Sequence, residues 1–225
     1  MTEHAIICVT FSTGPVKSID AVIPLIESGL PEYYVPEYDL KSAVSVLRVT
    51  TDRKITMVYR SSAFADHDYM SGNDFLFRRI TFKLRLGPMV VMPSILFFTT
   101  GNNSFLQLRF PSVVYDRISG ASGRGFDAGI KKLIILISTR IARALGLDGF
   151  SANLGDEEFI DRTPEIETIN QFVGYPDFWM KDPKRFMFAA CREVMVAQTF
   201  EADFDDPPFH YLCGDFAVFD CFWPT

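Results

Sequence analysis

The 225-residue sequence has few of the features that mark secreted or membrane-spanning chains. It has four cysteines and no CxxC pair, so we expect reduced, buried thiols of an intracellular protein. The first four residues, Met-Thr-Glu-His, lack the basic region that opens a secretory signal. The longest mostly apolar run, residues 88–98, contains a proline and is shorter than the roughly 20 residues that cross a bilayer. We therefore expect a cytoplasmic protein.

The motifs of common enzyme and metal sites are also missing. The sequence has no HExxH, no GxSxG elbow and no phosphate-binding loop ending in GK[ST]. Its three histidines are His4, His67 and His210. His67 lies between two aspartates in a polar stretch that is typical of an exposed loop, and the spacing of His210 from three nearby cysteines matches no usual zinc-ligand pair. We expect no catalytic activity, no metal and no cofactor.

A glycine-rich stretch at residues 120–129 has two interpretations. It precedes a predicted helix, and backbone amides at a helix N-terminus can bind a phosphate. The stretch does not open a βαβ unit, however, and Asp127 at the helix start would repel an anion. A connection between two parts of the fold is favoured, and anion binding stays open as the alternative.

Basic residues are missing from the last 33 residues, which carry seven acidic and eight aromatic side chains. The net charge of −6 is unevenly placed: residues 1–112 hold 11 basic and 10 acidic groups, and residues 113–225 hold 11 basic and 18 acidic groups. DNA and RNA are bound by cationic surfaces, so an acidic half argues against nucleic acid as the direct ligand. It suits a basic protein partner, whose approach it would steer.

The candidate partner-binding residues are acidic or aromatic and lie in the second half of the chain. One acidic group precedes Pro207-Pro208, and the two prolines predict a stiff, exposed loop that loses little entropy on binding. The other acidic group, residues 156–161, has two further interpretations: a carboxylate site for hydrolysis or a divalent ion, and the first turn of a helix. The aromatic turn at residues 174–179 suits an interface and a core equally. The candidates are Asp203, Asp205, Asp206, Asp156, Glu157, Glu158, Tyr175 and Trp179.

The first half of the chain predicts an antiparallel sheet of about five strands. Residues 5–11 predict a buried first strand, and residues 16–28 a helix that Pro24 kinks or shortens. Two hairpins are expected, one from residues 43–50 with 54–61 and one from residues 94–100 with 104–110.

Residues 75–86 form the most regular strand pattern in the sequence. Apolar and polar side chains alternate along them, which places Arg79, Lys83 and Arg85 together on one face. The pattern predicts a strand with one buried face and one wet, basic face.

The second half of the chain predicts helices. Residues 127–145 have helical spacing, with Asp127 as the N-cap and Gly146 as the stop. Two more helices are predicted where a capping residue is directly followed by a proline. One spans residues 163–174, and the other begins at residue 182. The last of these runs to about residue 197 or becomes a strand after Cys191.

A closing hairpin is favoured at residues 209–213 and 216–223, around Gly214-Asp215. The fold class expected is therefore α+β in one domain, residues 1–225, with the antiparallel sheet in the first half and the helices concentrated in the second.

In its acidic charge, its 22 phenylalanines and its lack of enzyme motifs, the whole chain resembles bacterial immunity proteins. These neutralise polymorphic toxins delivered by contact-dependent or type VI secretion systems. In character it looks closest to those paired with nuclease toxins that have a restriction-endonuclease-like domain. The resemblance implies a toxin inhibitor whose acidic surface blocks a cationic DNA-binding cleft, with no direct contact to nucleic acid or membrane.

Two other classes of function stay open. One is a structural or regulatory subunit of a phage or a secretion machine, with the aromatic side chains used in assembly. The other is an enzyme whose site assembles from scattered carboxylates and the glycine-rich stretch. The oligomeric state is open too. The basic strand face departs from a uniformly acidic picture, and either packs against the protein's own acidic helices or binds a different, acidic partner.

Overall fold

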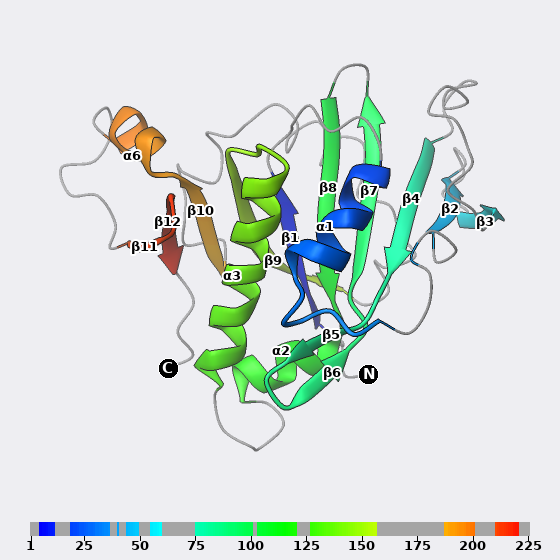
Figure 1. Cartoon of the computed structure of the whole chain (residues 1–225), viewed down its shortest axis with the longest axis horizontal. Helices are drawn as coiled ribbons and strands as arrows, with labels where there is room; N and C mark the ends of the chain where they lie inside the picture. The colour runs from blue at the N-terminus through cyan, green and yellow to red at the C-terminus, as the bar shows by residue number, and fades with distance from the viewer. Residues whose placement is uncertain are drawn as a thin grey trace.

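The computed structural model describes residues 5–11, 19–36, 40, 44–49, 55–59, 75–100, 103–120, 127–156, 187–200 and 210–220. Within these residues ten strands form one antiparallel sheet, in the order β11-β12-β10-β9-β1-β8-β7-β4-β2-β3. A two-stranded ladder, β5-β6, accompanies it. Figure 1 shows β11 and β12 at one end of the sheet and β2 and β3 at the other.

The strands are β1 (Ala5–Phe11), β2 (Val44–Val49), β3 (Ile55–Tyr59), β4 (Phe75–Thr81), β5 (Leu84–Leu86), β6 (Met89–Val91), β7 (Ser94–Thr100), β8 (Asn103–Phe110), β9 (Gly149–Asp156), β10 (Phe188–Arg192), β11 (Tyr211–Cys213) and β12 (Phe216–Asp220). The helices are a short 3-10 turn (Ile19–Ala21), α1 (Val22–Gly29), α2 (Ser112–Ser119), α3 (Ala128–Ala144) and α6 (Glu193–Phe200).

The predicted division into a sheet half and a helical half is wrong. The sheet has ten strands instead of about five; four of them, β9 to β12, come from the second half of the chain, and α1 comes from the first. The main omission is β9, a run of small and polar residues with little intrinsic preference for a strand. It pairs with β1 at seven positions, from Ala5↔Asp156 to Phe11↔Phe150, and with β10 on its other side. Pairing on both sides therefore decides its structure, and its composition does not.

The region from residue 187 onward is also corrected. Residues 188–192 form a strand and residues 193–200 a helix, the reverse of a helix that changes to a strand after Cys191. Phe188 and Ala190 belong to the main core, whereas Ala189 and Cys191 belong to a second, smaller core on the other face of the sheet. A strand that is buried on both faces reads as a continuous apolar run, which cannot be told from a buried helix by its spacing.

The main core lies between the sheet and a layer formed by α1, α2, α3 and the β5–β6 ladder. Helix α3 was predicted correctly. The Asp127 carboxylate accepts hydrogen bonds from the backbone N–H of Gly129 (3.1 Å) and of Ile130 (3.2 Å), which satisfies two amides that have no partner within the helix. Its isoleucines at positions 130, 134, 137 and 141 are at most 2% exposed.

Three predicted hairpins are confirmed by strand pairing: β2–β3, β7–β8 and β11–β12. The predicted helix at residues 16–28 appears as the 3-10 turn and α1. Pro24 lies in the first turn of α1, where the missing N–H of proline does no harm. Helix α2 was not predicted, although Pro111 before it, Gly120 after it in a left-handed conformation, and the buried pair Val114 and Ile118 mark it.

Phe150 of β9 joins the central sheet to its C-terminal strands. Its ring lies 5.8 Å from that of Phe11, 6.3 Å from that of Phe188 and 5.9 Å from that of Phe216, measured between centroids. These separations are within the range of favourable aromatic contacts. The cluster connects β9 to β1, β10 and β12, and accounts for part of the high phenylalanine content.

Strands β4 to β7 form one long hairpin, residues 75–100. The register Arg78↔Phe97 through Thr81↔Ser94 continues as Leu84↔Val91 through Leu86↔Met89, and the Phe82 N–H bonds the Pro93 carbonyl between the two ladders (3.2 Å). The alternation predicted for residues 75–86 therefore continues across a short interruption between β4 and β5. The tip turns at Gly87, whose φ of 59° suits glycine.

Candidate partner-binding surfaces

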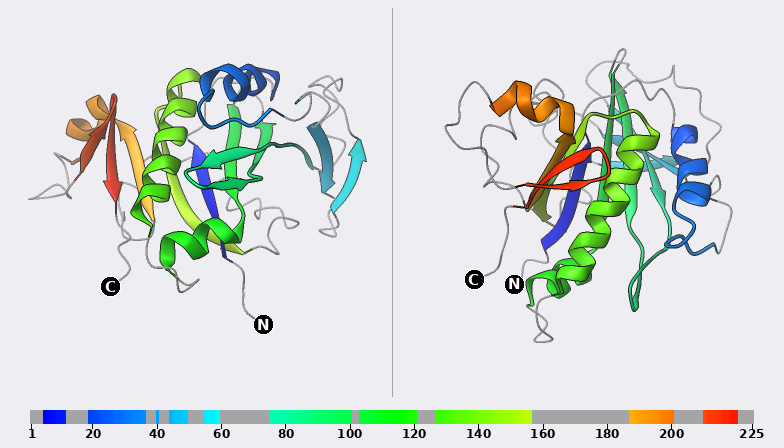
Figure 2. Two further views of the ribbon diagram at one scale, coloured as in Figure 1. Left: turned by 60° about the horizontal axis from the view of Figure 1, so that its bottom comes forward. Right: turned by 60° about the vertical axis from the view of Figure 1, so that its left-hand side comes forward.

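The C-terminal unit comprises β10, α6, β11 and β12, residues 187–200 and 210–220. The right-hand view of Figure 2 shows its hairpin next to α3. Helix α6 packs on the sheet face opposite to the main core, where it covers a second core of Ala189, Cys191, Ala217 and Phe219. Met195 and Val196 of α6 are half-buried against this second core.

Two large apolar side chains of the C-terminal unit are exposed. Val194 of α6 is 76% exposed, and Leu212 of β11 is 53% exposed. Leu212 pairs with Ala217, so its side chain lies on the face of the second core. Val194 precedes Met195 and Val196 in α6, which pack against the same core. We call these four side chains, Val194, Met195, Val196 and Leu212, the C-terminal patch. Exposed apolar side chains in a segment with charge of one sign are candidates for contact with another protein.

Asp215, at the turn of the β11–β12 hairpin, is held by two arginines. Arg143 of α3 donates from Nε (2.9 Å) and Nη2 (2.6 Å) to Oδ1, and Arg192 at the end of β10 donates from Nη1 to Oδ2. Desolvation alone would raise the pKa of Asp215, but the Arg143 hydrogen bond and the Arg192 charge lower it below its usual value. This carboxylate therefore fastens the hairpin to α3, and its charge is neutralised within the chain.

Gly214 makes the approach of Arg143 to the turn possible. Its φ is 67°, and a Cβ at this position would collide with the Arg143 guanidinium. The carbonyl of Asp215 also accepts a hydrogen bond from the Glu193 N–H (2.9 Å), which ties the turn to the first residue of α6. The hairpin, α3 and α6 are thus fixed to one another at this corner.

A second arginine of α3 is also engaged within the chain. Arg140 donates to the Glu32 carboxylate (2.5 Å), and its guanidinium carbon lies 5.4 Å from the Tyr33 ring centroid. The hydrogen bond from Arg140 is the main cause of the lowered pKa of Glu32. Arg140 and Arg143 therefore use their charges to hold the segment after α1 and the C-terminal hairpin against α3.

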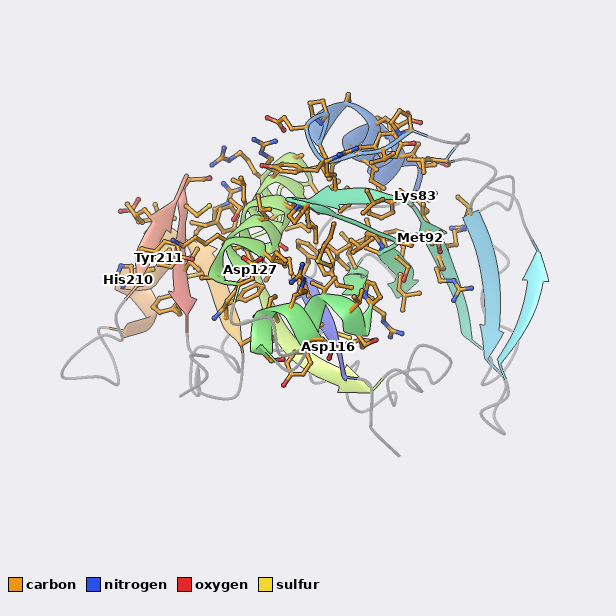
Figure 3. All side chains as sticks on the ribbon, turned by 90° about the horizontal axis from the view of Figure 1, so that it is seen from below. Lys83, Met92, Asp116, Asp127, His210 and Tyr211 are labelled. Carbon is orange, nitrogen blue, oxygen red and sulfur yellow. The ribbon has the colours of Figure 1, made fainter. Side chains whose placement is uncertain are left out.

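The outer face of the long hairpin is basic, as the sequence predicts. Arg79, Lys83 and Arg85 are half-buried or exposed on it, whereas Ile80, Phe82, Leu84 and Leu86 are buried on the other face. Near the tip the same outer face carries two exposed apolar side chains, Val90 (52%) and Met92 (51%). Figure 3 shows Lys83 and Met92 on the far side of α3 from His210 and Tyr211, so this surface is separate from the C-terminal patch.

A buried polar network lies further along the same sheet face, and sequence reasoning missed it. Gln107 of β8 donates to the Thr10 hydroxyl (3.0 Å) and accepts from Arg109 Nε (2.6 Å), and all three residues are at most 8% exposed. Burial raises the pKa of the adjacent Cys8 thiol to about 11, partly offset by the Arg109 charge. The thiol is therefore protonated at neutral pH and is a poor nucleophile. Polar residues at alternate positions of apolar strands, such as 107 and 109, were the available signal.

One predicted partner-binding residue falls in the described residues. Asp156 is the last residue of β9, opposite Ala5, so its interpretation as part of a helix's first turn is wrong. The other seven lie outside the described residues, and their grouping stays a prediction: Glu157, Glu158, Tyr175, Trp179, Asp203, Asp205 and Asp206. His67 with its flanking aspartates and residues 121–126 of the glycine-rich stretch also lie outside them.

The described part of the chain contains no group of three or more His, Cys, Asp or Glu side chains placed to hold a metal ion. The His210 ring packs against that of Phe219, with 5.3 Å between centroids. In the same residues, no helix combines the length and the apolar character that a membrane span requires.

Comparison of the chain with protein-family models, with curated proteins and with solved structures gives no match. Any functional conclusion therefore depends on the residues themselves.

Proposed function

We propose that this chain is an immunity protein that neutralises an antibacterial nuclease toxin by binding it through the C-terminal unit. One observation carries the proposal: Val194 and Leu212 are exposed on the C-terminal unit, within a segment, residues 193–225, that has seven acidic residues and no lysine or arginine. Apolar anchors surrounded by charge of one sign are what a charged partner with apolar pockets requires.

The two kinds of side chain have different roles in the proposed complex. The C-terminal patch supplies the area that is removed from water, and this area determines how slowly the complex dissociates. The acidic side chains speed the approach of a basic toxin. Asp215 takes no part in this attraction because Arg143 and Arg192 already neutralise it.

The remaining acids carry the charge of the proposed interface. Asp203, Asp205 and Asp206 precede the hairpin in sequence and are the first candidates; Asp156, Glu157 and Glu158 are the second, and Tyr175 and Trp179 are the proposed aromatic anchors. The protein would act in the cytoplasm as a stoichiometric inhibitor, without a metal or cofactor.

The proposal is tested first by isolating the partner. The tagged chain is expressed in its native host, copurifying proteins are identified by mass spectrometry, and each is expressed alone in a susceptible strain. A basic protein that kills the strain, and fails to kill it when the chain is coexpressed, supports the proposal. A partner that is harmless when expressed alone would instead favour a structural or regulatory subunit.

The surface is tested with the purified pair. The Asp203→Asn, Asp205→Asn, Asp206→Asn variant should associate more slowly and with weaker salt dependence, and Leu212→Ser with Val194→Ser should dissociate faster. The control is Asp20→Asn, Glu27→Gln, Asp116→Asn, which makes the same change in net charge on α1, on α2 and just before α1. Equal kinetics in all four proteins would place the interface elsewhere.

A further inference from the structure

The tip of the long hairpin carries a second surface whose chemistry is opposite to that of the C-terminal unit. Arg85 pairs directly with Val90. The same register continued by one pair, supported by the bond from the Phe82 N–H to the Pro93 carbonyl, places Lys83 opposite Met92. In a strand, positions two residues apart share a face, so these four side chains form one contiguous group.

The four side chains combine positive charge with exposed apolar surface. Arg85 is exposed and Lys83 half-buried, and about half of the Val90 and Met92 surface is open to solvent, 52% and 51%. Their neighbours in sequence, Leu84 and Val91, are buried in the main core, which holds the backbone of the tip in place. Such a surface is complementary to an extended segment that carries both carboxylates and large apolar side chains.

This chain contains a segment with that composition. Residues 200–209, Phe-Glu-Ala-Asp-Phe-Asp-Asp-Pro-Pro-Phe, include four acids, three phenylalanines and no basic residue. The segment begins at Phe200, the end of α6, and leads into His210, so both of its ends are in the C-terminal unit. His210 lies on the other side of α3 from Lys83 and Met92, as Figure 3 shows.

We propose that the outer face of the hairpin tip binds residues 200–209 of a second copy of this chain. The uneven charge of the chain favours the contact, because residues 113–225 have an excess of seven acids and residues 1–112 an excess of one base. The contact joins different surfaces of the two copies, so it builds a ring or a chain of copies.

An anionic membrane is the other kind of surface that basic and apolar side chains can meet. Segments that bind membranes by charge use clusters of about four to eight lysines or arginines. The hairpin tip offers Lys83 and Arg85, on a chain whose net charge of −6 opposes approach to an anionic bilayer. A protein segment is therefore the better complement, and lipid binding becomes an outcome of the test.

A peptide of residues 200–209 with a fluorescent label is titrated with the full-length chain, and binding is followed by anisotropy. Lys83→Glu with Arg85→Glu should weaken binding by about tenfold or more, and Val90→Ser with Met92→Ser should weaken it in both low and high salt. The matched control, Arg117→Glu with Lys132→Glu, reverses one half-buried and one exposed charge on α2 and α3 and should leave binding unchanged. Circular dichroism shows whether each variant is folded.

The assembly is tested by sedimentation velocity over a range of concentrations. Wild-type chain should associate, whereas Lys83→Glu with Arg85→Glu, and Asp203→Lys with Asp205→Lys and Asp206→Lys, should each stay monomeric. Mixing these two variants should restore association, because the reversed tip of one meets the reversed segment of the other. This experiment needs no toxin, so its outcome is independent of the proposed function.

Three results would overturn the inference. The first is a peptide that fails to bind wild-type chain, or binds the tip variants as well as the control. The second is a mixture of the two charge-reversed variants that remains monomeric. The third is binding to phosphatidylserine vesicles that the tip substitutions abolish while peptide binding is absent, which would assign the tip to a lipid surface.

Discussion

The long hairpin and the C-terminal hairpin turn in the same way but use their charges differently. Each turns over two residues and has a glycine with positive φ at the first of them, Gly87 and Gly214. The long hairpin presents Lys83 and Arg85 on its outer face. The C-terminal hairpin turns Asp215 inward to Arg143 and Arg192. The comparison shows that a charge in an unbalanced segment, such as that of Asp215, is not available to a partner where a distant residue of the chain neutralises it.

The two hairpins are also attached to the fold by different means. The tip of the long hairpin is attached by apolar side chains of its own, including Phe82 and Leu84, which are fully buried in the main core. The C-terminal unit is attached through Phe150, a residue of β9 whose ring contacts Phe188 and Phe216. Ion pairs add to this attachment, but packing of the phenylalanines should contribute most of the stability.

The largest effect is therefore expected from Phe150→Ala. The substitution removes a side chain that is 1% exposed and leaves a cavity among three other rings, so the free energy of unfolding should fall by about 3–5 kcal/mol. Urea denaturation followed by circular dichroism measures it. Met92→Ala on the outer face of the tip is the control and should change stability by less than about 0.5 kcal/mol. A loss for Phe150→Ala as small as that of the control would mean that the ion pairs hold the C-terminal unit.

Local features of the fold could be predicted from the sequence. The alternation that places Arg79, Lys83 and Arg85 on one face needs only neighbouring residues, and so does the cap that Asp127 provides for α3. The turn at Gly214 is local as well. These predictions are confirmed because each feature depends on only a few consecutive residues: the alternation of side chains in a strand, the side chain that caps a helix, and the glycine of a turn.

Features that depend on pairing between distant residues could not be predicted. Nothing in the sequence around Asp215 indicates Arg143, which is 72 residues away, or places Thr10 beside Gln107, which is 97 residues away. Strand β9 could not be predicted for the same reason. Its small and polar residues form a strand because β1 and β10 pair with it on either side. The last 33 residues are therefore acidic in composition, but Asp215 adds no net negative charge to their surface, because Arg143 and Arg192 neutralise it.

Replacing the glycine at each hairpin turn compares the two directly. Gly214→Ala and Gly87→Ala both force alanine into a positive φ, which costs about 1–3 kcal/mol. A Cβ at position 87 meets nothing within 4 Å, whereas at position 214 it displaces the Arg143 guanidinium from Asp215. Gly214→Ala should therefore destabilise the protein by about 1 kcal/mol more than Gly87→Ala, as measured by urea denaturation. Equal losses would show that the Arg143 contact adds no stability.

The smallest effect is expected from Asp215→Asn, and its pH dependence is the informative part. The carboxylate is 44% exposed, so loss of its charge should cost at most about 1 kcal/mol at pH 7. Because the folded state lowers the pKa of Asp215, the ionised carboxylate stabilises the fold fully above the unfolded pKa of about 3.9. That contribution disappears as the pH falls through the lower, folded pKa, so the difference between wild type and Asp215→Asn should shrink as the pH falls below about 3.9. Urea denaturation at pH 7, 4 and 3 measures the difference in the free energy of unfolding. A double-mutant cycle with Arg143→Met measures the interaction free energy between Asp215 and Arg143. A difference that persists unchanged at pH 3, or a cycle without coupling at pH 7, would mean that the shape of the turn and not the charge of Asp215 holds the hairpin against α3.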